Sequence, residues 1–326
     1  MFHEYASYCH NQLNNPDILD ELQRSEKFRS KKQAEIRELD EVIKNTENDE
    51  KLRATSARTK ARQWLRIDDQ EHKRLSHSRE QFLRHSIENY LLSLAASNVH
   101  DTDVLRFVAL WLAHADSKTA NDSVESRIDG VPSSKFTAIM NQMASRLQDN
   151  QDKFQFILSK LVERICLDHP FHGMHHIFSG SKTTGGSDKM AISRHAAATK
   201  IAVKLQKNPD RTKIWTAIHR SNKLYVDLAT EKSAETRAGV KLPLKSLASG
   251  KAVDREIPAL AVPPITISVV LRSDLDYSNV PTIKHFKPEI AIAGGLSHPK
   301  IVTAMASNGI VYKELVHPFI ALHESH

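Results

Sequence analysis

A long stretch without glycine or proline limits what the first part of the chain can fold into. Neither residue type occurs anywhere from Asp17 to Asp129. Turns between strands need such residues, whereas long helices exclude them. Apolar residues also recur at helical spacing, for example at Ile36, Leu39 and Ile43. We therefore predict long helices over this stretch, with the polar segment 44–50 as the turn between two of them.

The helical pattern continues through the middle of the chain. Apolar residues spaced three and four apart predict further amphipathic helices over 102–115, 136–147, 154–165, 190–205 and 214–228. No sequence repeat of fixed period accompanies them, so any repeat is structural only. Successive amphipathic helices with short polar joints are typical of a helical solenoid or of a bundle of long antiparallel helices.

The residue pattern changes after Gly239. Prolines at positions 243, 258, 263 and 264 indicate a linker over 241–262. Five runs rich in β-branched residues then predict short strands in an antiparallel meander, at 265–271, 282–286, 289–293, 300–306 and 310–316. The expected fold class is therefore mainly α, followed by a small, incomplete antiparallel β-sheet.

The bulk composition excludes several classes of protein. The two cysteines, Cys9 and Cys166, lie far apart without metal-like spacing, which favours a reducing compartment over a disulfide framework. The N-terminus lacks the pattern of a secretory signal, and no apolar run is long enough to predict a membrane span. The formal net charge of +7 fits a nuclear protein near nucleic acid, and equally a solvated, lysine-biased surface.

A dense histidine group, DHPFHGMHH, is the first candidate site. Its spacings of three and four could place two imidazoles on one helical face for zinc. No cysteine or carboxylate recurs at ligand spacing, and Pro170 and Gly173 interrupt a regular helix. We therefore favour a helix terminus with packed or exposed histidines over a metal site. The four histidines are His169, His172, His175 and His176.

Three further features have ordinary interpretations. The loop 179–189 superficially resembles a Walker A sequence, but it lacks the Gly-Lys-Ser/Thr ending and a preceding strand. Cys166 lies on an apolar helical face, where a thiol is usually inert. The basic run 51–84 is interleaved with acidic residues, so it reads as the solvated face of a long helix.

The segment AGGLSHPK is the strongest candidate for a ligand site. A glycine pair between strands lets the backbone approach phosphates and form an anion nest. Lys300 begins the next strand and could lean toward the same ligand. A hairpin that binds nothing is the alternative, and spacing alone favours it. The candidate nucleotide-binding residues are Ala293, Gly294, Gly295, Leu296, Ser297, His298, Pro299 and Lys300.

The order of these segments resembles a known family. ENYLLSLAASNVHDTDVLRFVALWL, KFTAIMNQMASRL, RICLDHPFHGMHHIF and TIKHFKPEIAIAGGLSHPKIV follow one another as in the ATM-type kinases, a branch of the phosphoinositide-3-kinase-related protein kinases. The similarity is collinear over roughly residues 1–316. Within that branch the sequence is most similar to the fungal kinases of telomere maintenance and the DNA-damage response.

The resemblance implies a division of the chain into parts. Residues 1–180 resemble the C-terminal part of the FAT helical region, 181–240 its helical junction to the kinase domain, 241–262 a linker, and 262–316 the first strands of the kinase N-lobe. The tail 317–326 departs from the family pattern. The AGGLSHP turn corresponds to the family's phosphate loop, which covers the ATP phosphates.

The departure in the tail bears on activity. After KELV the family continues with a lysine that contacts the ATP phosphates and a glycine, whereas this chain has His317 and Pro318. Histidine does not replace a permanently charged ammonium, and proline disrupts a strand. The chain also has no Asp-Arg-His catalytic loop and no Asp-Phe-Gly magnesium motif. We therefore expect it to be inactive alone, and assign it no catalytic and no metal-binding residues.

The expected function is that of a fragment of an ATM-like kinase. The resemblance implies phosphorylation of serine or threonine followed by glutamine, with ATP and magnesium, in DNA-damage signalling and telomere maintenance. It also implies a nuclear location, a homodimer, a DNA-end sensor complex as partner, and dependence on the remainder of the kinase domain. The alternative is a non-enzymatic helical scaffold that binds full-length kinase or a regulator. Direct DNA binding by the basic helix is a third, less favoured possibility, which would require strongly salt-dependent affinity.

Overall fold

The computed structural model describes residues 1–182, 188–233, 236–295 and 297–317. Its internal contacts divide the chain into two compact units, Met1–Val131 and the part from Pro132 onward. This division concerns packing only, and the family boundaries near 180, 240 and 262 stay predictions.

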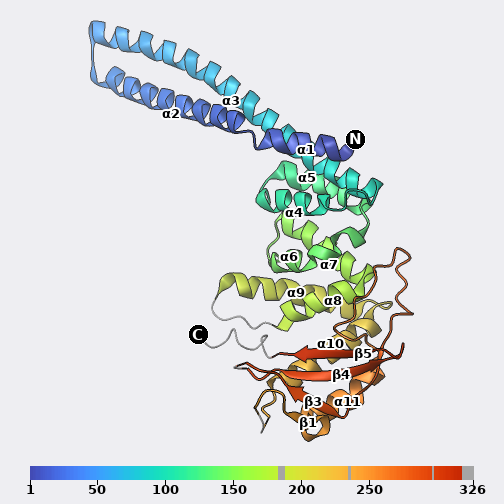
Figure 1. Cartoon of the computed structure of the whole chain (residues 1–326). Helices are drawn as coiled ribbons and strands as arrows, with labels where there is room; N and C mark the ends of the chain where they lie inside the picture. Colours follow the sequence, from blue (N-terminus) through green and yellow to red (C-terminus); the bar gives the residue numbers. More distant parts are fainter. Residues whose placement is uncertain (183–187, 234–235, 296, 318–326) are drawn as a thin grey trace. The chain divides into compact units, whose positions relative to one another are not determined.

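The first unit is entirely helical, as the sequence predicts. Its two longest helices, α2 and α3, lie side by side as an antiparallel hairpin (Figure 1). Asn15 caps α2 by accepting a hydrogen bond from the Asp17 amide, and Pro16 occupies the first helical turn. The break between α2 and α3 falls at residues 46–47, inside the predicted turn. The helices are α1 (Phe2–Leu13), α2 (Pro16–Asn45), α3 (Asn48–Ala96), α4 (Asp103–Ala113), α5 (Lys118–Arg127) and the 3-10 helix η1 (Ile128–Gly130).

The two ends of the hairpin are stabilised differently. None of the residues of α2, all of which the structure describes, is buried. Ion pairs join α2 to α3. Among them are Arg29 with Asp69 at 2.6 Å and Asp40 with Arg58 at 2.8 Å. The last part of α3 instead buries an apolar face against α1, α4 and α5, consisting of Leu83, Ile87, Tyr90, Leu91 and Leu94.

In the second unit the predicted helices 154–165, 190–205 and 214–228 are confirmed, whereas the predicted helix 136–147 is the 3-10 helix η2 followed by the six-residue helix α6. A proline starts α8 directly after α7 ends, as expected at a first helical turn. Gly173 in α8 lies so near α7 that a Cβ there would be 2.9 Å from the Cys166 sulfur. The helices are η2 (Ser133–Ile139), α6 (Met140–Ser145), α7 (Lys153–Asp168), α8 (Pro170–Lys182), α9 (Lys189–Lys207), α10 (Thr212–Thr230), η3 (Leu244–Ser246) and α11 (Ala248–Leu260).

A five-stranded antiparallel sheet completes the second unit (Figure 1). β3 pairs with the first residues of β4, β2 with its last residues, and β5 along nearly its whole length. Apolar residues of the sheet, α10 and α11 share one buried core, which includes Leu228, Val253, Ile283 and Val302. The strands are β1 (Lys241–Pro243), β2 (Ile283–Phe286), β3 (Glu289–Ile292), β4 (Lys300–Ala306) and β5 (Val311–Val316).

Two predictions at the start of this sheet are wrong in detail. The run 265–271 is not a strand but part of an irregular segment, in which Ile265 and Val270 are exposed. The fifth strand is β1 instead, and it lies within the predicted linker 241–262, most of which is the helix α11. Pro258 lies inside α11, so the proline pattern misled the assignment. The fold class itself is confirmed.

Candidate functional site

The candidate site is the turn that joins β3 to β4, residues 293–299, of which Leu296 lies outside the described residues. The turn is closed by the Ala293 amide, which donates to the Pro299 carbonyl at 2.7 Å, and by a longer bond of 3.3 Å from the His298 amide to the Gly295 carbonyl. Gly295 has a φ of +122°, which residues with a side chain rarely adopt. Apart from its chain neighbours, no atom lies within 4 Å of where a Cβ at Gly295 would be, so there is open space on that side of the backbone.

The turn also reaches the end of β5. The Ser297 hydroxyl oxygen lies 2.9 Å from Nε2 of His317, the residue that follows β5. His317 holds the sequence position where the resemblance places the ATP-contacting lysine. The structure therefore brings the predicted phosphate turn and that position together, although they are distant in sequence.

Lys300 was predicted to bind the same ligand as the turn, but its side chain binds the end of α10 instead. Its side chain is 3% exposed, and its ammonium donates to the carbonyls of Ala229 at 3.2 Å and Glu231 at 2.7 Å. Both carbonyls lie at the C-terminal end of α10. Burial lowers the pKa of Lys300, and the nearby Glu231 carboxylate partly opposes this effect. The ammonium thus binds a helix end, and phosphate binding by the turn stays a prediction.

Glu231 completes this junction from the other side. Its carboxylate accepts hydrogen bonds from the Ala248 amide at 2.9 Å, the Ser249 amide at 2.7 Å and the Ser249 hydroxyl. These groups form the N-terminus of α11, where a negative charge is favourable. Burial alone raises the pKa of Glu231, but the hydrogen bonds from Ser249 and Ala248 and the Lys300 charge lower it overall. Sequence reasoning did not single out Glu231, because its partners are 17 and 18 positions away.

A buried acid, Glu314 of β5, was also missed. It is 1% exposed. One carboxylate oxygen accepts from the Tyr225 hydroxyl at 2.6 Å, and the other accepts from the Ile265 amide at 2.7 Å. Burial raises the pKa of Glu314, and the two hydrogen bonds partly oppose it. Glu314 therefore ties β5 to α10 and to the irregular segment that follows α11.

The histidine group packs the start of α8 against that same irregular segment. Nδ1 of His169 lies 2.6 Å from the Tyr277 hydroxyl, and the His172 Nε2–H donates to the Val269 carbonyl at 2.9 Å. His175 contacts Asn222 of α10. Among the described residues, no group of three or more His, Cys, Asp or Glu side chains could hold a metal ion. His169, His172 and His175 are thus packed by hydrogen bonds. The expectation that Pro170 and Gly173 interrupt a regular helix is wrong, because Pro170 occupies the first turn of α8 and the helix continues through Gly173.

Three further predictions concern Cys166, the loop 179–189 and membrane-spanning helices. Cys166 is fully buried in α7, and burial raises the pKa of its thiol. Of the Walker-like loop 179–189, residues 183–187 lie outside the described residues, but the loop prediction is wrong at its ends, because 179–182 belong to α8 and Lys189 begins α9. No helix within the described parts of the chain is both long and apolar enough to cross a membrane.

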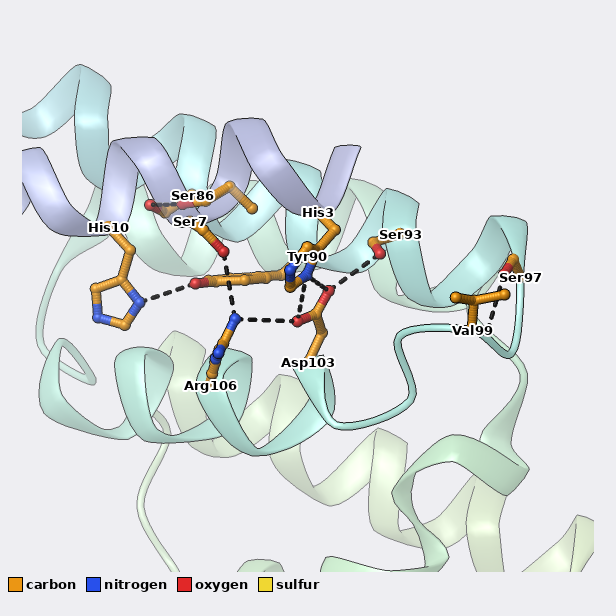
Figure 2. Close-up of polar contacts among 11 residues, drawn as sticks. His3, Ser7, His10, Ser86, Tyr90, Ser93, Ser97, Val99, Asp103 and Arg106 are labelled. Carbon is orange, nitrogen blue, oxygen red and sulfur yellow. Dashed lines mark hydrogen bonds and ion pairs between the residues drawn. The ribbon is translucent and has the colours of Figure 1, made fainter. Parts of the chain in front are cut away.

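Figure 2 shows a buried polar network in the first unit. The Asp103 carboxylate of α4 lies 2.8 Å from Nδ1 of His3 in α1 and accepts from the Ser93 hydroxyl of α3 at 3.0 Å. Arg106 lies 3.7 Å from the same carboxylate. A serine nucleophile would have to hydrogen-bond to the imidazole that acts as its base. Ser93 contacts the Asp103 carboxylate and not the His3 imidazole, so these residues do not have the arrangement of a catalytic serine with its base. The network anchors α1 onto α3 and α4.

Comparison with known proteins identifies the chain. No family model matches it. The serine/threonine-protein kinase tel1 of Emericella nidulans is 44% identical over 316 residues, which is 97% of this chain and 11% of that protein. The tel1 kinase of Schizosaccharomyces pombe is 30% identical over 323 residues, covering 96% of this chain and 11% of that protein. The chain is a fragment of an ATM-type kinase, similar to the Tel1 proteins.

Solved structures agree with this assignment. The open conformation of CtTel1 matches with a TM-score of 0.88 and 42% identity over 97% of this chain and 11% of that one. The structure described as the FAT and kinase domain of CtTel1 matches with a TM-score of 0.85 and 41% identity, over 96% of this chain and 21% of that one. CtTel1 has also been solved as a dimer with C2 symmetry, with a TM-score of 0.86, 41% identity, and coverage of 97% of this chain and 11% of that one. The chain spans 11% of the length of the curated relatives named above.

Proposed function

We propose that this chain contributes the phosphate-covering turn of an ATM-like kinase that uses ATP and magnesium to phosphorylate serine or threonine followed by glutamine. The observation that carries the proposal is the turn itself. Gly295 adopts a backbone conformation suited to glycine, its Cβ direction is open, and Ser297 ties the turn to the end of β5. Bound Mg·ATP would supply the phosphoryl group and the charge that the turn contacts.

The role of these residues is to position phosphates. Backbone amides of a glycine-containing turn bind phosphate oxygens without a side chain in the way. Phosphoryl transfer then depends chiefly on positioning and electrostatic stabilisation, for which a catalytic-loop Asp and metal ligands are required. This sequence has neither motif, so we propose that the 326-residue polypeptide by itself does not transfer phosphate. Nuclear action at DNA damage and telomeres, with homodimerisation and a DNA-end sensor partner, belongs to the same proposal.

A glycine substitution tests the turn. We expect Gly295→Val in the complete kinase to raise KM for ATP by about tenfold, because the Cβ blocks the phosphates and strains the backbone. Gly309→Val is the matched control, because Gly309 also has a positive φ, of +77°, with open space around it, but lies in the β4–β5 turn. Equal KM values for both variants and the wild type would refute a phosphate-binding turn. Phosphorylation of a Ser-Gln peptide by the 326-residue chain alone would refute its proposed inactivity.

One observation favours the scaffold function as a second candidate. Large apolar side chains on the α2–α3 hairpin are exposed, namely Phe28, Leu52, Trp64 and Ile67. A pull-down of full-length kinase by the purified chain, lost in Trp64→Glu and retained in Lys51→Glu, would support this function. Failure of the wild-type chain to retain the kinase at micromolar concentration would argue against it.

A further inference from the structure

Lys300 occupies an unusual place for a lysine at the start of a strand. Its ammonium is buried, and a buried ammonium is costly unless hydrogen-bonded acceptors surround it. The two acceptors here are the Ala229 and Glu231 carbonyls at the end of α10. A helix C-terminus carries partial negative charge and unpaired carbonyls, so a cation is favourable there. The contact therefore specifies where α10 ends relative to β4.

The backbone of Lys300 adds a second constraint at the same point. Lys300 pairs with Ile292 of β3 on one side and with Val316 of β5 on the other. Ile292 immediately precedes the turn, and Lys300 immediately follows it. The strand pairing of Lys300 therefore fixes the residues at both ends of the turn, which we call its stems. The residue after Val316 is His317, which contacts Ser297.

Glu231 extends this junction to a second helix. Its carbonyl binds the Lys300 ammonium, and its carboxylate caps the N-terminus of α11. A displacement at the end of α10 would thus change the contacts of the turn and of α11 together. Solvent cannot readily substitute for these bonds at Lys300, because its side chain is only 3% exposed.

We propose that Lys300 is a positioning residue for the phosphate-covering turn, which it fixes to the end of α10 and, through Glu231, to the start of α11. It acts by holding the stems of the turn and not by touching the phosphates. This inference rests on the proposed function of the turn for its catalytic consequence. The mechanical coupling of the turn to α10 and α11 can be tested without nucleotide.

The first experiment measures coupling in the 326-residue chain by hydrogen exchange. In Lys300→Met we expect the amides of Ala293, Ala248 and Ser249 to exchange about tenfold faster, because the junction that orders them is lost. The Val302 amide in the core of the sheet should be unchanged, which shows that the variant is folded. Lys300→Arg should restore most of the protection, and Lys284→Met, at an exposed position of β2, should match the wild type.

If Lys300→Met does not fold, Glu231→Gln provides the second test. This substitution keeps the backbone carbonyl that binds Lys300 but weakens the cap of α11. The Ser249 amide should therefore lose protection from hydrogen exchange, and the Ala293 amide should lose less. Unchanged exchange at Ala293 in a folded Lys300→Met chain would overturn the proposal. In Glu231→Gln, unchanged exchange at Ser249 would also overturn it.

The second experiment measures steady-state kinetics in the complete kinase. We expect Lys300→Met to raise KM for ATP by about tenfold with a much smaller change in kcat, because the turn is displaced while the catalytic groups are intact. Lys300→Arg should partly rescue KM. A loss of kcat alone, or an unchanged KM, would overturn the positioning role. If Gly295→Val leaves KM for ATP unchanged while the hydrogen-exchange results are as expected, the proposed nucleotide role of the turn is refuted. The coupling of the turn to α10 and α11 is then still supported.

Discussion

At the scale of single residues, three acidic or basic side chains among the described residues are buried almost completely, and each binds elements that are distant in sequence. Asp103 joins α1, α3 and α4, Lys300 joins β4 to α10, and Glu314 joins β5 to α10 and to the segment after α11. Buried charges of this kind are retained only where hydrogen bonds replace water. Removing one partner leaves the others unsatisfied, which makes these positions sensitive to substitution.

Asp103→Ala should destabilise the chain by roughly 1.5–3 kcal/mol, because His3 and Ser93 lose a charged acceptor in the interior. Urea denaturation measures the change. Asp116→Ala is the control, because Asp116 is exposed, and we expect it to cost less than about 0.5 kcal/mol. Equal stability of the two variants would show that the network in Figure 2 contributes nothing to anchoring α1.

Glu314 should make stability depend on pH. Burial raises its folded pKa above the ordinary value of 4.5. The folded state therefore binds the proton more tightly than the unfolded state, and stability falls as pH rises from 4.5 through the folded pKa. Glu314→Gln removes the charge and keeps one acceptor: its amide oxygen can accept from the Ile265 amide, while its NH2 group can donate to the Tyr225 hydroxyl oxygen. Its stability relative to the wild type should therefore be greater at pH 8 than at pH 4. A difference that does not change with pH, in urea denaturation at both values, would contradict this.

These residues mark the limit of what the sequence could predict. The Gly-Gly turn was found because glycine pairs between strands are a local pattern, and Gly295 does have a positive φ. The partners of Lys300 are 71 and 69 positions away, and those of Glu314 are 89 and 49 positions away. Contacts of such range depend on how helices dock onto the sheet, which no local spacing encodes.

At the scale of elements, long helices were predictable and short strands were less so. The Gly- and Pro-free stretch predicted the long helices α2 and α3 and the turn between them, though not where α3 ends, and the apolar spacing predicted α4, α7, α9 and α10 close to their observed bounds. The run 265–271 has strand-like composition, but no strand in the described part of the chain pairs with it, and side chains such as Glu314 and His172 hold its backbone instead. β1 was missed because it is three residues long and takes its strand character from pairing with β3.

The close approach of α7 and α8 gives a test at this scale. In Gly173→Ala the new Cβ would lie 2.9 Å from the Cys166 sulfur and 3.0 Å from its Cα, so a backbone must move. Overpacking costs roughly 1–3 kcal/mol, and the better helix propensity of alanine returns up to about 1 kcal/mol. We expect a net loss of about 1–2 kcal/mol in urea denaturation. Gly130→Ala has no atom within 4 Å of the new Cβ and should be neutral.

At the scale of the whole molecule, the net charge of +7 is small, and ion pairs occupy many of the basic side chains. Arg29, Arg58 and Lys204 each lie within 2.8 Å of a carboxylate oxygen. We therefore expect only weak, non-specific affinity for duplex DNA, with Kd of roughly 10⁻⁴–10⁻⁶ M at physiological salt. Fluorescence anisotropy with a labelled duplex measures it. Nanomolar binding with a steep salt dependence would instead favour a direct role at DNA.

The length of α3 has a mechanical consequence. Its 49 residues span about 74 Å at 1.5 Å per residue. The large apolar side chains packed against α1, α4 and α5 lie between Leu83 and Leu94, so the hairpin turn at 46–47 is about 55 Å from that anchor. A tilt of about 5° at the anchor would move the hairpin turn by about 5 Å. The hairpin is a lever arm, and a probe attached at Thr46 would amplify angular changes too small to detect at the packed end.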